Sequence, residues 1–165
     1  MNAADIPPIA AGLTVLIGLV FGTLTIRQWQ RTRYLTAAAE LVRTMQTAEF
    51  TRSIARIVEL PEHGDAKALA ADREVMAAFY AVSHVFESLG VLVYHRLLPL
   101  HLVDHLCGGY VRASWKRVHP IVIARRETLG AMFGEWFQWL AERIDEYPAP
   151  GKDVGAPVAF KNWRP

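Results

Sequence analysis

Apolar residues follow two patterns along this chain: one long uncharged stretch near the start, and helical periodicity over most of the remainder. Residues 6–26 read IPPIAAGLTVLIGLVFGTLTI and contain no charged side chain. A helix of this length measures roughly 31 Å at about 1.5 Å per residue, which matches the hydrocarbon thickness of a bilayer. The pattern therefore predicts one N-terminal transmembrane helix. The alternative is a buried core helix of a soluble protein, although core helices are usually shorter and seldom uncharged for so long.

The charges on either side of this stretch predict its orientation. Asp5 is the only charged side chain before it, whereas Arg27, Arg31 and Arg33 come after it. A cleaved signal peptide has the opposite order, with its basic residues first. By the positive-inside rule, the N-terminus lies outside the cytoplasm and the rest of the chain lies within it. We therefore expect a single-pass protein of the plasma (inner) membrane, with residues 1–33 as its anchor and basic juxtamembrane segment.

The next part of the chain has apolar residues at intervals of three and four, which is typical of amphipathic helices, and no run of alternating strand-like residues. The anchor helix is expected to continue to Met45, and a further helix to end at Pro61 and Gly64. The clearest helix carries an apolar seam from Val75 to Val93. Further predicted helices cover residues 100–106, closed by Gly108-Gly109, residues 111–122, kinked or split at Pro120, and residues 130–147.

Short connections between these helices favour an antiparallel bundle. We therefore predict an all-α fold, in which the transmembrane helix is followed by a small cytoplasmic helical bundle over residues 34–147. Residues 148–165 contain four prolines and no helical period, so they are expected to form an extended tail. The tail is either disordered or a docking arm whose Phe160 and Trp163 insert into a partner, since buried aromatics carry much of the energy of many interfaces.

Composition narrows the classes of function. The chain has 165 residues, of which 52% are hydrophobic, and a formal net charge of +2. This charge is small and its basic residues are scattered or adjacent to the predicted span, so we expect contacts with anionic lipid and no nucleic-acid binding. Cys107 is the only cysteine, which excludes an internal disulfide and a zinc site built from several cysteines.

A cluster of histidines and acids is the best candidate for chemistry. His101, Asp104 and His105 form an HxxDH sequence, in which two histidines four residues apart share a helical face and could chelate a metal. His84 and Glu87 on the preceding predicted helix could join them. The acid is Asp rather than Glu, the supporting helix is short, and no distal ligand is identifiable by spacing. We therefore predict no bound metal and no cofactor, with these residues as weak candidates and helix capping as their expected role.

Glu87 lies on a second apolar face of its predicted helix, about 120° from the main seam, and is therefore expected to be partly buried. A buried carboxylate must be paired or protonated, because leaving it bare costs several kcal/mol. Arg112 on the next predicted helix, or alternatively Lys116 or His105, could supply the partner. We predict a structural ion pair between Glu87 and Arg112 that joins the two helices.

The predicted span contains one interaction motif. Gly18 and Gly22 form a GxxxG sequence, which lets another helix approach closely in a membrane. We predict helix–helix contact at these glycines, through either self-association or docking on a larger membrane protein.

No motif for nucleophilic catalysis or phosphate binding is present, since the chain lacks GxSxG, GxGxxG and Walker sequences. The middle of the chain, residues 70–143, resembles an uncharacterised bacterial family of single-span membrane-anchored helical proteins that carries a domain-of-unknown-function label. The resemblance rests on Phe86-Glu87, Asp104, Gly108-Gly109, Trp115, Pro120, Glu135-Trp136 and Leu140. It implies an N-terminal span with a cytoplasmic helical domain, and it transfers no catalytic residue.

The sequence therefore favours a non-catalytic, membrane-anchored interaction or scaffold module, and no enzyme. Such a module would serve as an accessory or stabilising subunit of a larger membrane protein complex, with lipid and other membrane subunits as partners. The alternative is a small membrane-bound metal-dependent enzyme that uses the histidine and carboxylate cluster.

Overall fold

A computed structural model describes the backbone of residues 6–147 and 155–164, and their side chains except those of residues 6–17, 26–27 and 29–34. Every regular element in this part of the chain is a helix, which confirms the all-α prediction. The chain divides into two compact units, Met1–Glu40 and Leu41–Pro165. We describe each unit by itself.

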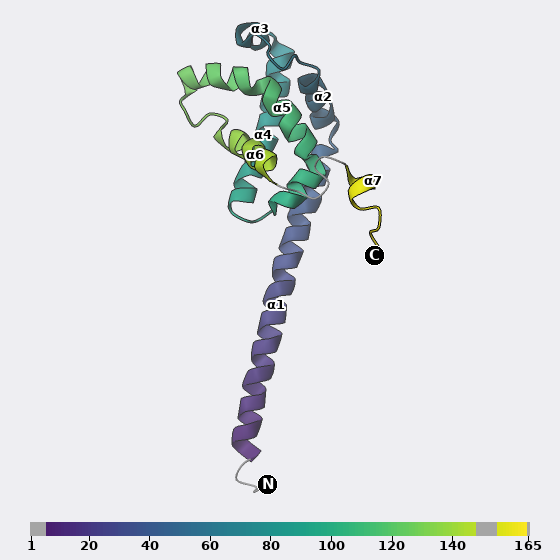
Figure 1. The fold of residues 1–165 in the computed structure, drawn as a ribbon. Coiled ribbons are helices and arrows are strands. Elements are labelled where there is room, and N and C mark those ends of the chain that lie inside the picture. Colours follow the sequence, from purple (N-terminus) through teal and green to yellow (C-terminus); the bar gives the residue numbers. More distant parts are fainter. Residues whose placement is uncertain (1–5, 148–154, 165) are drawn as a thin grey trace. The chain divides into compact units, whose positions relative to one another are not determined.

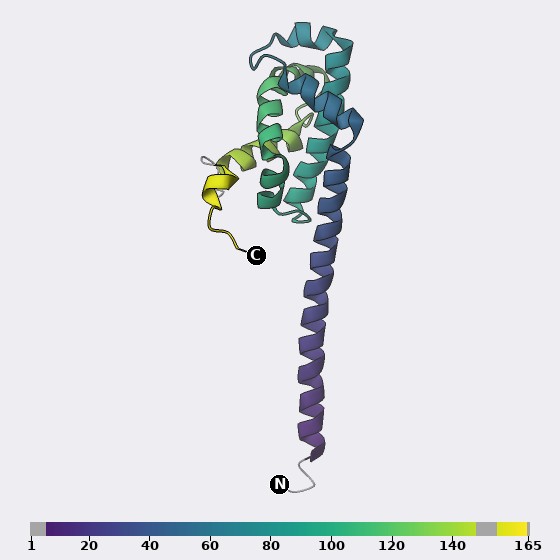
Figure 2. The ribbon, with the colours of Figure 1, turned by 90° about the vertical axis from the view of Figure 1, so that its right-hand side faces the viewer.

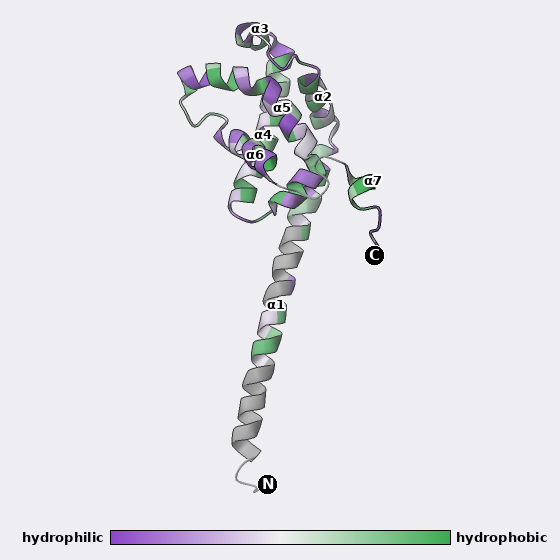
Figure 3. Cartoon of the chain, in the orientation of Figure 1, coloured by the Kyte–Doolittle hydropathy of each residue, from purple (hydrophilic) through white to green (hydrophobic). Residues whose placement is uncertain are grey.

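The first unit consists mainly of α1 (Ile6–Met45), a continuous helix of 40 residues whose last turn belongs to the second unit. Its end coincides with the predicted continuation to Met45. The predicted span over residues 6–26 lies mostly outside the described side chains. The part that is described, residues 18–25, is exposed and includes Leu19 and Phe21, each 66% exposed. Figure 3 shows apolar residues among the described positions of α1.

The second unit is a bundle built around two long helices. Its elements after α1 are α2 (Ala48–Val58), α3 (Ala66–Ala71), α4 (Arg73–Tyr94), α5 (Leu100–Leu129), α6 (Glu135–Glu146) and α7 (Ala156–Ala159). Helix α4 packs against both α2 and α6, and α5 packs against the same two helices from another side (Figure 1, Figure 2). The short α3 contacts α4 and α5.

The predicted apolar seam of α4 forms the centre of the core. Val75, Val82 and Val93 are all buried, as are the larger side chains between them. Phe86 meets Phe50 of α2 and Phe137 of α6, with ring centroids 6.0 and 5.0 Å apart. These aromatic contacts explain why three helices that are distant in sequence pack together, because large rings contribute most of the apolar area that a small core buries.

Local capping fixes where α4 begins. The carboxylate of Asp72 accepts hydrogen bonds from the backbone N–H groups of Glu74 and Val75, at 2.8 and 3.1 Å. Arg56 of α2 reaches the same carboxylate at 3.1 Å. The N–H of Val75, that of Glu74 and the charge of Arg56 together lower the pKa of Asp72 despite some desolvation. A side-chain acceptor at this position is what the orphan N–H groups of a helix start require.

Two predicted helix breaks are wrong. Helix α5 runs without interruption from Leu100 to Leu129, so it neither ends at Gly108-Gly109 nor splits at Pro120. Gly108 is buried in a helical conformation, and a Cβ there would meet the carboxylate of Asp104, so this glycine serves packing rather than termination. Burial of one face of α5 against α2 and α6 outweighs the local cost of Gly and Pro.

The last large helix also begins later than expected. Gly130 and Gly134 both have positive φ, at 95° and 70°, so α6 starts only at Glu135. Helix α3 was not predicted. In the tail, residues 156–159 form the short helix α7, whereas the whole of residues 148–165 was expected to be extended.

One helix in the described part of the chain is long and apolar enough to cross a membrane, and it is α4. In its most apolar window 44% of the residues are buried inside the second unit. A core helix of a soluble protein passes the same test of length and composition, so α4 is explained by its central place in the bundle.

Candidate functional site

A pocket of about 310 Å³ lies where α4 meets the segment that leads into α6. The pocket combines aromatic walls with a few polar groups, the composition typical of small-ligand sites. Its lining residues are Phe79, Tyr80, Ser83, His84, Glu87, Met132, Phe133 and Gly134. We refer to this site as the Glu87 pocket.

Glu87 performs a specific structural task at this pocket. Its Oε1 accepts a hydrogen bond of 2.7 Å from the backbone N–H of Phe137, in the first turn of α6. The residue before α6 is Gly134, which has no side chain to cap the helix. Glu87 therefore supplies from α4 the acceptor that an N-cap side chain normally provides, and its negative charge faces the positive end of the helix dipole.

Two further features of the chain let α6 lie this close to α4. Gly90 stands one turn beyond Glu87, and a Cβ on it would collide with the backbone carbonyl of Trp136. Arg126 of α5 donates from Nε to the carbonyl of Phe133 at 2.8 Å, which fixes the segment before α6. The position of Glu87 relative to α6 is thus set by residues from two helices.

Burial raises the pKa of Glu87 above its ordinary value. The N–H groups of Phe137 and Trp136 act in the opposite direction, because hydrogen bonds to a carboxylate favour its ionised form. The neighbouring charges of Glu135 and Arg126 have smaller and opposing effects. Desolvation of the ionised carboxylate therefore exceeds the compensation that the fold provides.

The predicted ion pair between Glu87 and Arg112 is wrong. Arg112 pairs with Asp104, eight residues earlier on the same helix, through Nη1 and Oδ1 at 2.9 Å. The side chain of Asp104 is only 6% exposed and that of Arg112 is 28% exposed. Glu87 does join two helices as expected of it, but these are α4 and α6, and its partner is a backbone N–H group. The error arose because α6 was expected to begin five residues earlier.

The weak metal candidates are not brought together. The rings of His101 and His105 lie 6.4 Å apart on the exposed side of α5, while Asp104 is used by Arg112. His84 and Glu87 line the Glu87 pocket, whereas Asp104 and His105 line a different one of about 390 Å³. Across the residues with described side chains, no group of three or more His, Cys, Asp or Glu is arranged to hold a metal ion.

Cys107 is the remaining nucleophilic side chain of interest. It is buried in α5, and its Sγ donates to the carbonyl of Val103 at 3.3 Å. Burial, aided by the charge of Asp104, raises the pKa of its thiol to about 12. A thiol in this state is inert, because the thiolate is the reactive form.

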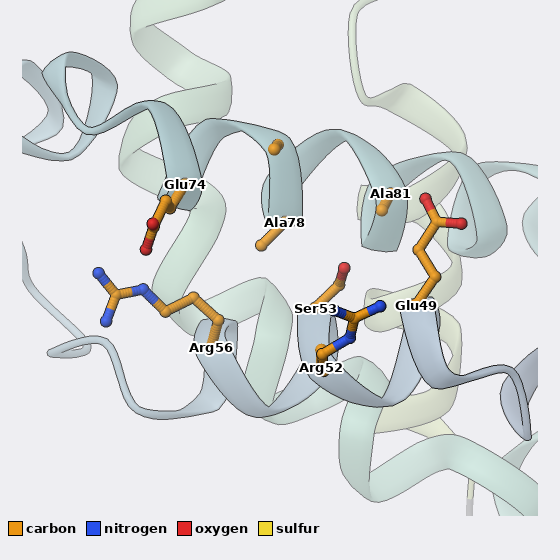
Figure 4. Close-up of a pocket in the computed structure, with 8 residues that line it drawn as sticks. Glu49, Arg52, Ser53, Arg56, Glu74, Ala78 and Ala81 are labelled. Carbon is orange, nitrogen blue, oxygen red and sulfur yellow. The ribbon is translucent and has the colours of Figure 1, made fainter.

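A second groove, of about 560 Å³, runs between α2 and α4 (Figure 4). Alanines of α4 form its floor, among them Ala78 and Ala81. Charged side chains of both signs rise on its walls, and Figure 4 shows Arg56 and Glu74 extending from α2 and α4 on the same side of the groove. The small residues thus leave a surface hollow between two packed helices.

The predicted interaction residues are placed as follows. A Cβ added at Gly18 or Gly22 of α1 would meet nothing within 4 Å. Trp163 is 71% exposed, and Phe160 directly follows α7 with its ring 6.4 Å from that of His105. The contacts predicted for these four residues remain predictions.

Sequence reasoning missed the capping role of Glu87, although one signal was available. The segment that leads into α6 reads Gly134-Glu135-Trp136-Phe137, with no Ser, Thr, Asp or Asn at the helix start. A helix start that lacks such a residue needs an acceptor from elsewhere in the fold. The half-buried acid on α4 meets that need.

A sequence model of the family described as "Domain of unknown function (DUF4760)" matches residues 12–144, which is most of the chain. The predicted resemblance to an uncharacterised family is thereby confirmed, while bacterial origin and a single span stay predictions. The chain matches no curated protein and no solved structure.

Proposed function

The chain belongs to the DUF4760 family, and within it we propose a non-catalytic role as a membrane-anchored interaction module. Residues 6–26 would form the single membrane span, with the N-terminus outside and the helical unit in the cytoplasm. The module would serve as an accessory or stabilising subunit of a larger membrane protein complex.

The observation that carries this proposal is the exposure of apolar side chains on α1. Residues 18–25 are all exposed, and Leu19, Val20, Phe21 and Leu24 are between 49% and 66% exposed. Large apolar side chains that are contiguous and uncovered mark a surface that lipid or another protein covers. The basic residues after this stretch favour a cytoplasmic position for the second unit.

The described side chains of the second unit also support a structural rather than a catalytic role. Glu87 caps α6, Asp104 pairs with Arg112, and Cys107 is buried with a raised pKa. These three groups, which could otherwise perform acid–base or nucleophilic chemistry, are thus already engaged by the fold. Exposed Trp163 and the uncovered glycines of α1 are the corresponding candidates for partner contact.

The experiment that tests this function is gentle detergent extraction of native membranes with an affinity tag at the C-terminus, followed by native mass measurement. We expect the chain in the membrane fraction, resistant to alkaline carbonate, and in stoichiometric complex with a larger membrane protein. Recovery from the soluble fraction, or as a monomer carrying about one metal ion per chain, would contradict the proposal.

A pair of substitutions tests the predicted contact in the span. Gly18→Leu with Gly22→Leu is expected to weaken the complex without blocking insertion, because leucine side chains keep another helix at a distance. Val20→Leu with Leu24→Ile, on the opposite face of the same helix, is the matched control and should leave the complex intact. Equal complex recovery for both double variants would remove the glycines from the interface.

A further inference from the structure

We propose that the Glu87 pocket binds an organic ammonium group, with Glu87 as the counter-ion and aromatic side chains as the walls. This inference is independent of the membrane role, because it rests on the side chains of the second unit alone.

The walls of the pocket have the chemistry that recognises organic cations. Phe79 meets both Tyr80 and Phe133, with ring centroids 5.2 and 6.1 Å apart. Met132, which is exposed, forms part of the rim. Aromatic faces attract alkylammonium groups through their quadrupole, and this attraction is stronger than that for hydrated metal ions because an alkylated nitrogen loses less water.

The charge of the pocket favours a cation. Glu87 lines it, and the charged residues that affect Glu87 are Glu135, of the same sign, and Arg126, of the opposite sign. These three side chains leave one negative charge in excess. Arg126 directs its Nε to the carbonyl of Phe133, so its charge is shared with the backbone. The titratable groups on the same wall of α4 are Tyr80 and His84.

The polar groups of the pocket have unused bonding capacity. The Oγ of Ser83 is buried and has no hydrogen-bond partner among the described residues, whereas Ser88 on the same helix donates to the carbonyl of His84 at 2.8 Å. Such an orphan hydroxyl is uncommon in folded proteins. A carboxylate offers about four lone-pair sites, and the cap on Phe137 uses only part of that capacity. Ser83 and Glu87 lie one helical turn apart on α4, so a single ligand can reach both.

An ammonium group would supply what the fold leaves out. The ionised carboxylate of Glu87 is desolvated and makes no ion pair with the side chains that the structure describes, so an opposite charge in the pocket stabilises it. Choline, a primary amine or the lysine side chain of a partner protein share this chemistry. A pocket of about 310 Å³ holds the head of any of them.

The test uses the full chain in a non-ionic detergent and choline chloride as the probe, at constant ionic strength. Saturation-transfer NMR on the choline methyl protons reports binding. The matched probe is 3,3-dimethyl-1-butanol, which has the same shape with carbon in place of the charged nitrogen. We expect saturable binding of choline in the millimolar range, and about tenfold weaker binding of the neutral analogue.

Variants locate the site. Glu87→Gln is expected to weaken choline binding about tenfold, whereas Glu142→Gln, which removes an exposed charge from α6 outside the pocket, should leave it within about twofold. Tyr80→Leu removes one aromatic wall from an exposed position, so it keeps the fold and should weaken binding severalfold. Circular dichroism establishes that each variant is folded.

Three results would overturn the proposal: no saturable choline signal, equal binding of the neutral analogue, or unchanged affinity in folded Tyr80→Leu. Nα-acetyl-lysine-methylamide and phosphocholine then distinguish the sources of the ammonium group. Tighter binding of the lysine analogue indicates a partner side chain, and tighter binding of phosphocholine indicates a lipid head group. The membrane role is judged separately by carbonate extraction, so failure of one proposal does not imply failure of the other.

Discussion

Replacement of Glu87 by Ala removes the side-chain acceptor that the described residues provide at the start of α6. The N–H of Phe137 is partly buried and would lose its hydrogen bond of 2.7 Å. Losing a helix cap costs about 1 kcal/mol, and an unsatisfied buried donor costs about 1–3 kcal/mol. Because water reaches part of this site, we expect a loss of about 1–2 kcal/mol in the free energy of unfolding. For a unit of this size, that corresponds to a melting temperature lower by roughly 4–8 °C.

Glu87→Gln separates the acceptor from the charge. The glutamine carbonyl still accepts from Phe137, but the desolvated charge is gone. Because burial raises the pKa of Glu87 above 4.5, the folded state favours the protonated form. The stabilising contribution of the protonated form is therefore complete below the unfolded-state pKa and is lost as the pH rises through the folded-state pKa. At neutral pH, Glu87→Gln should be at least as stable as the natural chain, and this advantage should disappear on acidification.

Thermal unfolding followed by circular dichroism, from about pH 4 to about pH 8 in one detergent, measures both effects. Glu127→Ala, an exposed acid on α5, is the matched control for removal of a carboxylate from a helix. The reasoning is refuted if Glu87→Ala unfolds at the same temperature as the natural chain. It is equally refuted if Glu87→Gln loses as much stability as Glu87→Ala, because the charge would then matter more than the acceptor.

Three more predictions concern buried or strained positions. Cys107, whose thiol pKa rises from 9.0 to about 12, should react about a thousandfold more slowly with iodoacetamide at about pH 8 in the folded chain than in urea; equal rates would place the thiol at the surface. Asp104→Ala should cost about 1–3 kcal/mol in chemical denaturation because Arg112 loses its partner, and the double variant Asp104→Ala with Arg112→Met should recover part of this loss. Gly134→Ala should destabilise by about 1–2 kcal/mol, because its φ of 70° disfavours a Cβ that would also lie 2.9 Å from Val122, whereas Ala at exposed, helical Gly109 should be tolerated.

The helices that were predicted well are those with a continuous apolar face. The seam from Val75 to Val93 keeps one periodicity over about five turns, and it became the core helix α4. Helix α3, by contrast, has only six residues and none that is buried, so it presents no seam to recognise. Its start depends on the carboxylate of Asp65, which accepts from the N–H of Lys67. Short capped helices of this kind leave a weak signal in hydrophobic patterning.

The errors in α5 have a different origin. Gly108, Gly109 and Pro120 are local helix breakers, and their intrinsic preferences led to the prediction of two helices. Six apolar side chains and Ser114 along one face of α5 are buried in the bundle, together with Gly108. This shared burial keeps the helix continuous. Local propensity was thus outweighed by contacts that form only in the folded state.

The sequence by itself determined the helical class, because periodicity of three and four residues needs no partner to be recognised. It also determined which apolar faces turn inward. Only the tertiary structure decided the partners of the charged groups: Glu87 caps Phe137, fifty residues away, and Arg112 pairs with Asp104 on its own helix. Spacing along a chain restricts which helical face a side chain occupies, but the packing of one helix on another decides which atoms it meets.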